Sequence, residues 1–227
     1  MTGSRLQSSK SRLTPRQMDR FAGPSLFDKI GRAVCTAATL PAKEFFEAWE
    51  AARRIRRQFR GGRIVDMAGG HGLLAHILLL LDDSSPQAIV VDINRPASSR
   101  SLAAALVNEW PRLQGRISYV TTPIEAFDIQ PDDLIVSLHA CGALTDTILE
   151  MAVIMGSRVA VLPCCHDLKR CDTGGLQGWM DGPMAVDATR AAKLRAGGYT
   201  VFTRTIPSAI TPQNRLLLGR PQDYRSG

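Results

Sequence analysis

The stretch RIVDMAGGHGLLAHILLLLDD, residues 63–83, joins two apolar runs through a turn rich in glycine. The first run, Arg63–Met67, is short and contains β-branched residues, which predicts a buried strand. The second run, Gly72–Leu81, has the length and composition of a helix. An acid, Asp66, stands at the end of the strand, and glycines follow where a backbone could pass close to a ligand. The stretch therefore predicts a strand, a ligand-binding turn and a helix in succession.

Short apolar runs and helical patterns keep alternating after this stretch. Further strands are expected at Ala88–Asp92, Ile117–Val120, Leu134–Leu138, Val159–Pro163, Thr200–Ile206 and Arg215–Gly219, and further helices at Pro96–Glu109, Leu144–Met155 and Met184–Ala196. Such alternation predicts a parallel sheet covered on both faces. The last two strands are joined by a loop, Pro207–Asn214, which favours an antiparallel pair at one edge. We therefore expect an α/β fold: a Rossmann-like, doubly wound seven-stranded sheet, mostly parallel with an antiparallel last strand, plus N-terminal helices.

The chain divides into three predicted segments. Residues 1–15 are predicted to form a disordered basic tail, and residues 16–60 an N-terminal helical extension. Residues 61–221 are predicted to form the ligand-binding α/β domain. In the extension, the pattern over Arg16–Ala38 is interrupted near Gly23-Pro24, while Pro41–Phe59 predicts a more regular helix.

The excess positive charge lies before the glycine turn. The net charge is +7, and residues 1–60 carry 13 Lys and Arg against 5 Asp and Glu, whereas the remainder carries 15 against 16. A basic block beside a near-neutral domain indicates a polyanion partner, and RNA is the candidate. Arg53, Arg54, Arg56 and Arg57 would contact it; the alternative is that they form a solvated helix face.

Composition also indicates the compartment. Five cysteines, an odd number with two adjacent, do not resemble a disulfide framework, so a reducing cytoplasm is expected. No apolar run reaches the roughly 18–20 residues that span a bilayer, and the N-terminus has no apolar signal-peptide region. We expect a cytoplasmic protein without a membrane partner; the sequence does not indicate its oligomeric state.

Two acids indicate which cofactor the turn binds. The second strand ends at Asp92, where a carboxylate can accept hydrogen bonds from a ribose diol. A dinucleotide would require G-x-G-x-x-G, but here the pattern is A-x-G-x-G, and Asp66 beside the turn would repel a pyrophosphate. That acid suits a cationic amino-acid end, as in S-adenosylmethionine. A purely structural glycine turn is the alternative.

The pattern D-x-A-G-G-H-G resembles motif I of the class I methyltransferases, [DE]-x-G-x-G-x-G, with Ala68 at the first glycine position, and VVDIN (Val90–Asn94) resembles their motif II. This resemblance implies S-adenosyl-L-methionine as the cofactor. The residues it assigns to the cofactor site, together with the histidine after the fourth strand, are Asp66, Ala68, Gly69, Gly70, Gly72, Asp92, Ile93 and His139.

Three further stretches are similar to a narrower group. SLHACGALTD (Ser137–Asp146), LPCCH (Leu162–His166) and ITPQNRLLLG (Ile210–Gly219) resemble the methyltransferase-domain family that includes tRNA acceptor-stem 2′-O-methyltransferases and related methyltransferase-like proteins. The resemblance implies a methyltransferase acting on RNA (tRNA or rRNA), with Asn214 as a candidate substrate contact. The alternatives are methylation of a small molecule or protein, and an RNA-binding protein with a degenerate methyltransferase fold.

The polar clusters after the fourth and fifth strands allow three chemistries. His139 contacts the cofactor while it or His166 orients or deprotonates an acceptor. Alternatively Cys141, Cys164 or Cys165 is a nucleophile, as in RNA cytosine-C5 methyltransferases. A metal held by Cys164, Cys165, His166 and Cys171 lacks the usual C-x-x-C spacing, so we assign none. Cys165 and its neighbours could instead line an apolar pocket. The candidate catalytic residues are His139, Cys141, Cys164 and His166.

Overall fold

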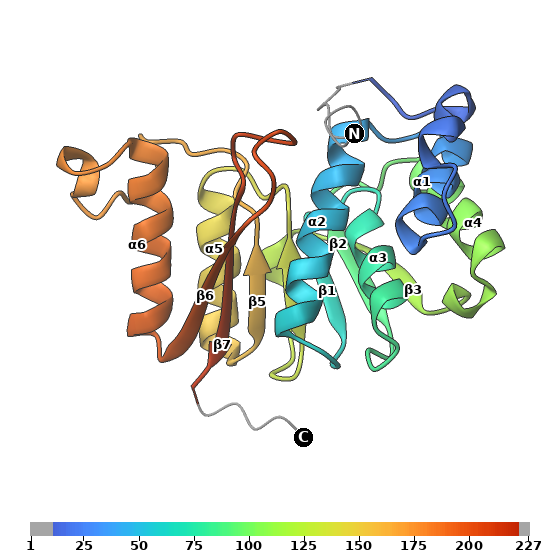
Figure 1. Ribbon diagram of the computed structural model, residues 1–227. Helices are drawn as coiled ribbons and strands as arrows, with labels where there is room; N and C mark the ends of the chain where they lie inside the picture. Colours follow the sequence, from blue (N-terminus) through green and yellow to red (C-terminus); the bar gives the residue numbers. More distant parts are fainter. Residues whose placement is uncertain (1–10, 223–227) are drawn as a thin grey trace.

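The computed structural model describes residues 11–222 of the 227-residue chain. Seven strands form one sheet in the order β3-β2-β1-β4-β5-β7-β6 (Figure 1). The strands are β1 (Ile64–Met67), β2 (Ala88–Asp92), β3 (Ile117–Thr121), β4 (Leu134–Ser137), β5 (Arg158–Val161), β6 (Tyr199–Thr205) and β7 (Arg215–Pro221). The helices are α1 (Leu26–Ala37), α2 (Ala42–Gln58), α3 (Leu73–Leu81), α4 (Ser99–Glu109), α5 (Ala143–Met155) and α6 (Gly182–Ala196), with short 3-10 helices at Pro15–Phe21, Pro111–Leu113, Ile124–Ala126 and Leu176–Gly178.

The pairing of the strands confirms the predicted sheet. β1 is parallel to β2 and β4, β2 to β3, and β4 to β5, whereas β7 is antiparallel to both β5 and β6. The loop between β6 and β7 is too short for a crossover helix, so β7 returns beside β6 and inserts next to β5. Because β1 lies between β2 and β4, the sheet grows in opposite directions from it, and ligands bind at the carboxyl end of such a strand.

The sheet is buried on both faces, which explains why its central strands read as apolar runs. Ile64 and Val136 contribute to one hydrophobic cluster, which also contains residues of α1, α2, α3 and α4. Val65 and Ile135, one position along each strand, contribute to the opposite cluster with residues of α5 and α6. This alternation follows from the two-residue period of a strand, and it makes the fold doubly wound as predicted.

The N-terminal helices share the core of the sheet. Phe45 and Phe46 of α2 are buried in the cluster that also contains strand residues such as Ile64. The predicted boundary after residue 60 therefore does not separate two hydrophobic cores. The disordered tail predicted for residues 1–15 lies partly outside the described residues, but Leu13 is buried and its N–H donates to the Leu40 carbonyl. Residues 11–15 are ordered because an apolar side chain anchors them.

Local signals explain where the helices begin. The interruption predicted near Gly23-Pro24 separates the first 3-10 helix from α1, and the Ser25 side chain caps α1 by accepting a hydrogen bond from the Asp28 N–H (3.2 Å). Asp181 caps α6 in the same way (3.0 Å to the Met184 N–H). Within residues 11–222, no helix combines the length and apolar character needed to cross a membrane.

Candidate functional site

The turn after β1 is tightly packed around Asp66. This residue is only 2% exposed, and its carboxylate accepts a hydrogen bond from the Ala75 N–H at the start of α3 (3.3 Å). A Cβ added at Gly69 would lie 2.7 Å from the Asp66 Cγ, so no side chain fits there. Gly70 has open space around it but a φ of +52°, and Ala68 adopts a similar left-handed φ of +53°. Ala68 thus reproduces the backbone conformation expected of a glycine at this motif position.

Burial controls the protonation of Asp66. The loss of water around the carboxyl group raises its pKa to about 7, with a smaller increase from the charge of Asp92, while the hydrogen bond from Ala75 acts in the opposite direction. The carboxylate is therefore poised to gain from a nearby cation, because a positive charge would favour its ionised form.

Asp92 fastens the glycine turn to the end of β2. Its two carboxylate oxygens accept hydrogen bonds from the Gly70 N–H (2.9 Å) and the Asn94 N–H (3.0 Å). Each oxygen can accept a further bond, so this pairing leaves Asp92 able to bind a ribose hydroxyl. Ile93, which follows it, is 62% exposed and presents an apolar surface beside the turn.

His71 and Gly72 complete the turn on the side of β3. The Tyr119 hydroxyl donates to the His71 carbonyl (2.7 Å), and the His71 ring forms a hydrogen bond with the Ser98 hydroxyl (2.8 Å). A Cβ at Gly72 would lie 2.7 Å from the Tyr119 hydroxyl, so this glycine is required by close approach. His76 is a buried helix residue whose ring forms a hydrogen bond with the Gly72 carbonyl (2.7 Å).

A cavity of about 250 Å³ lies over the turn. Its lining comes from the turn, from the start of α3, from the segment after β4 and from the N-terminal helical segment; it comprises Leu40, Glu44, Ala48, Asp66, Ala68, Gly69, Gly70, His71, Leu73, Leu74, Leu138 and His139. The sequence did not indicate Leu40, Glu44 and Ala48 as site residues. Their spacing showed only that α2 is amphipathic, whereas its packing over the glycine turn is a tertiary contact.

His139 and Glu44 interact electrostatically across this cavity. The residue His139 is exposed, yet the protein around its ring removes enough water to lower its pKa, and the Glu44 carboxylate opposes this effect. Desolvation raises the pKa of Glu44, while His139 lowers it. A histidine with a lowered pKa is neutral at physiological pH and can accept a proton.

Three of the five cysteines lie together after β4 and β5. The Sγ atoms of Cys141 and Cys164 are 3.2 Å apart, and those of Cys164 and Cys165 are 3.8 Å apart. Cys165 is exposed, so the expectation that it lines an apolar pocket is wrong. Cys171 is buried beside Arg190 instead, with 3.7 Å between its Sγ and the guanidinium nitrogen.

His166 points toward α6 and belongs to an ionic network there. Its Nε2 is 2.8 Å from the Asp187 carboxylate, which also accepts hydrogen bonds from Arg215 (2.7 Å) and Arg190 (3.4 Å). The metal set considered from the sequence, Cys164, Cys165, His166 and Cys171, is therefore not brought together: its last two members are engaged with Asp187 and Arg190.

The arginines of α2 differ in their surroundings. Arg56 is 4% exposed, donates to the Leu78 carbonyl (3.1 Å) and the Ser85 hydroxyl (2.8 Å), and pairs with Asp82 (3.3 Å). It is a structural residue, and its assignment to a substrate-binding surface is wrong because no phosphate can reach it.

The other predicted substrate contacts remain at the surface. Arg53 and Arg54 pair with Glu50, and Arg54 also donates to the Thr205 carbonyl (2.7 Å), whereas Arg57 is exposed. Asn214 donates to the Ile206 carbonyl (2.9 Å) and closes the loop between β6 and β7.

The donors and acceptors around the cavity fit S-adenosylmethionine. Asp66 and Glu44 provide acidic groups for an ammonium and a sulfonium, and Asp92 retains lone pairs for a ribose. The cavity lies at the carboxyl end of β1, where the order of the sheet reverses. Together with the antiparallel β7, these features define the class I S-adenosylmethionine-dependent methyltransferase fold.

Comparison with known proteins agrees with this class. Residues 43–171, more than half of the chain, match the sequence profile of the family described as "Methyltransferase domain", and the chain belongs to that family. It therefore contains an S-adenosylmethionine-dependent methyltransferase domain. It is also 30% identical over 112 residues to a glutathione S-transferase C-terminal domain-containing protein of Xenopus laevis; the match covers 47% of this chain but only 16% of that protein.

Solved structures support the fold. The S-adenosylmethionine-dependent methyltransferase SibL has a TM-score of 0.53 at 18% identity, covering 95% of this chain and 64% of that one. The tRNA methyltransferase TrmK of B. subtilis has a TM-score of 0.51 at 16% identity, covering 77% and 66%. The chain thus spans slightly less than two thirds of each of these two proteins.

Proposed function

We propose that this methyltransferase acts on RNA, with tRNA or rRNA as the substrate class. The observation that carries the proposal is a pair of basic residues, Arg12 and Lys43, whose charges act on two histidines of the cavity wall. Burial is the main cause of the lowered pKa of His71 and of His139. The charge of Arg12 lowers the pKa of His71 further, and the charge of Lys43, which also pairs with Glu47 (3.5 Å), does so for His139. Both histidines line the cavity, so a polyanion held by these cations would lie beside the transferred methyl group.

Each residue around the cavity has a defined task in this proposal. S-adenosylmethionine supplies a methyl group on a sulfonium. Asp66 and Glu44 complement its positive charges, Asp92 accepts from the ribose hydroxyls, and Ile93 covers the base with an exposed apolar side chain. Gly70, with open space around it, leaves room for the ligand against the backbone, while Gly69 lets the turn pack closely on Asp66.

His139 is the proposed acceptor-side group. Neutral because of its lowered pKa, it accepts the proton that a 2′-hydroxyl or a ring nitrogen loses as the methyl group is transferred. Alignment of acceptor and methyl group supplies much of the rate in such a displacement. The motif resemblance to tRNA 2′-O-methyltransferases favours the hydroxyl.

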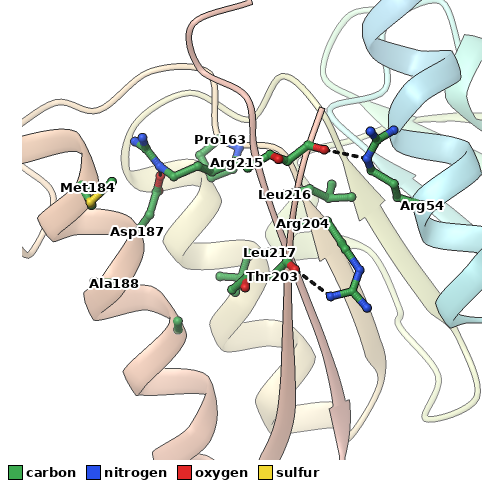
Figure 2. A pocket seen from close by; sticks show the side chains of 12 residues that line it. Arg54, Pro163, Met184, Asp187, Ala188, Thr203, Arg204, Arg215, Leu216 and Leu217 are labelled. Atoms are coloured by element: carbon green, nitrogen blue, oxygen red, sulfur yellow. Dashed lines mark hydrogen bonds and ion pairs between the residues drawn. The ribbon is translucent and has the colours of Figure 1, made fainter. Parts of the chain in front are cut away.

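A second candidate substrate is a small molecule, because a pocket larger than the cavity over the glycine turn includes Pro163, just after β5. It has a volume of about 670 Å³ and lies between α6 and the β6–β7 pair (Figure 2). Pro163 at its wall precedes Cys164, and Arg215 and Met184 contribute a cation and an apolar side chain. This volume is in the range of small-molecule sites, roughly 300–1,000 Å³.

Transfer of a labelled methyl group separates the two candidates. Purified protein is incubated with labelled S-adenosylmethionine and, in separate reactions, total RNA, protein extract and a small-molecule extract. Label in RNA that is sensitive to ribonuclease is the expected result. Label in the small-molecule fraction alone would contradict the RNA proposal and favour the pocket beside α6.

The salt dependence of RNA binding tests the two cations directly. Arg12→Gln combined with Lys43→Gln removes two phosphate contacts, so the plot of log affinity against log salt should become less steep by about 2. The control is Arg195→Gln with Arg220→Gln, which removes two charges from the last turn of α6 and from β7, outside the cavity wall. An unchanged slope in the first variant, or an equal change in the control, would contradict the proposed RNA surface.

A further inference from the structure

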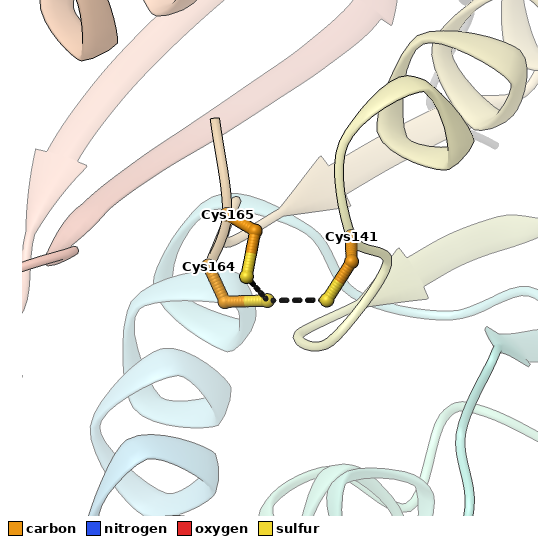
Figure 3. Close-up of side chains that lie close together, drawn as sticks. All are labelled: Cys141, Cys164 and Cys165. Atoms are coloured by element: carbon orange, nitrogen blue, oxygen red, sulfur yellow. Dashed lines mark hydrogen bonds between the residues drawn. The ribbon is translucent and has the colours of Figure 1, made fainter. Parts of the chain in front are cut away.

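Three thiols lie close together in the segments that follow two neighbouring strands (Figure 3). Cys141 follows β4, and Cys164 and Cys165 follow β5. The three Sγ atoms all lie within 4.8 Å of one another. The separation is 3.2 Å between Cys141 and Cys164 and 3.8 Å between Cys164 and Cys165. Cys141 and Cys165 are exposed and Cys164 is half-buried, so an ion can reach them from solvent.

The separations match those of sulfurs that share one metal ion. A tetrahedral zinc ion with Zn–S bonds of about 2.3 Å holds its sulfurs about 3.8 Å apart. The Sγ atoms of Cys164 and Cys165 are at this separation (3.8 Å), and those of Cys141 and Cys164 are closer, at 3.2 Å. Small side-chain rotations would therefore suffice for three thiolates to bind one ion.

The backbone fixes the two cysteine segments relative to each other. The Gly142 N–H donates to the Cys165 carbonyl (3.2 Å), and the Leu162 N–H donates to the Ser137 carbonyl (2.9 Å). These bonds continue the pairing of β4 with β5 beyond the strands. The ligands are thus held in place by the sheet, and binding requires little ordering of the chain.

We propose that Cys141, Cys164 and Cys165 bind one Zn²⁺ ion as three thiolates. Each thiol releases its proton to solvent, and the fourth tetrahedral position is left to a water molecule, as in catalytic zinc sites. Cys141 lies two residues after His139, which belongs to the cavity wall. This inference goes beyond methyl transfer and does not depend on which substrate is methylated.

Metal binding by the full chain tests the site. Protein kept reduced with a phosphine under nitrogen is titrated with Zn²⁺ against a chromophoric chelator, and bound zinc is counted by mass spectrometry. Wild type should bind one ion per chain. Cys141→Ser, Cys164→Ser and Cys165→Ser should each weaken binding by at least about tenfold, because each removes a ligand. Cys171→Ser, a cysteine outside the cluster, should bind as wild type does.

Cobalt provides a second readout that counts the sulfur ligands. Co²⁺ in the site should give a thiolate-to-metal charge-transfer band in the near ultraviolet, weaker in each of the three cluster variants than in Cys171→Ser. Thermal unfolding and calorimetry with S-adenosylmethionine on the same samples report on the fold and the cofactor site separately. Wild type that binds no zinc, cluster variants that bind it undiminished, or an equal loss in Cys171→Ser would each overturn the proposal.

Discussion

Asp66 has a buried carboxyl group near the end of β1. The unfolded chain ionises this group near pH 4, roughly the reference value, whereas burial holds its proton until about pH 7 in the folded chain. Between these values the folded state binds more protons, so the free energy of unfolding falls as the pH rises. The buried Asp66 carboxyl group therefore lowers the stability of the folded protein at neutral pH and above. This loss of stability is consistent with a role of Asp66 in binding a cation.

Asp66→Asn should make the protein without cofactor more stable at pH 8 than wild type, by about 2–4 kcal/mol. The amide keeps an oxygen for the Ala75 N–H but cannot ionise. The advantage should shrink as the pH falls from 7 toward 4, where wild type regains its proton. Urea unfolding of both proteins at pH 5 and pH 8 measures it. An equal difference at the two pH values would show that ionisation of Asp66 is not responsible.

Gly69→Ala should disturb the turn by steric contact alone. The added Cβ would lie 2.7 Å from the Asp66 Cγ and 2.9 Å from the Asp66 carbonyl oxygen. Relief of such overlap costs about 1–3 kcal/mol, and it should also weaken S-adenosylmethionine binding. Gly178→Ala is the matched control, since a Cβ there meets nothing within 4 Å. Denaturant unfolding and calorimetry measure both effects; a Gly69→Ala protein indistinguishable from the control would refute the close approach.

Helix α2 performs two tasks at the level of the element. Its first half supplies Glu44 and Ala48 to the cavity wall, and Arg56 in its last turns anchors the helix to α3 and to the chain just after α3. Burial lowers the pKa of Arg56 to about 10, so the residue keeps its charge at neutral pH and pairs with Asp82.

Arg56→Ala should therefore lower the free energy of unfolding by about 3–5 kcal/mol, because it breaks a buried ion pair. Arg57→Ala, one residue further on the same helix but exposed, should change it by less than about 0.5 kcal/mol. Both substitutions remove a positive charge near the helix C-terminus. The difference between their effects on stability therefore reports the contribution of the buried ion pair. Guanidinium unfolding of the two variants is the measurement. Similar losses of stability would mean that the charge at the helix end, rather than the buried pair, is what matters.

At the scale of the whole molecule, the sequence was sufficient to predict the strands of the sheet and the glycine turn. The seven strands, and the antiparallel direction of the last, follow from apolar runs separated by helical patterns or by a loop. Most strand boundaries agree within one or two residues; β2, predicted at Ala88–Asp92, is observed there. The glycine turn and its two acids were predictable because backbone geometry and charge act locally.

Other features depend on contacts between distant segments. Arg56 and Arg57 are adjacent arginines on one predicted helix, and the sequence does not show which of them faces α3. Cys141 is separated from Cys164 by a complete helix and strand, so no short spacing motif brings the three thiols together. The packing of α2 against the cavity could not be predicted for the same reason. Amphipathic spacing predicts that one face of the helix is buried, but not which segment that face covers.

The position of the cofactor is tested most directly by calorimetry at pH 7.5 with S-adenosylmethionine and with NAD. We predict one S-adenosylmethionine site per chain, no binding of NAD, and at least a tenfold weaker site in Asp92→Ala, since a charge-assisted contact contributes about 1.5–3 kcal/mol. Binding of NAD in place of S-adenosylmethionine, or undiminished S-adenosylmethionine affinity in Asp92→Ala, would contradict a cofactor site at the glycine turn.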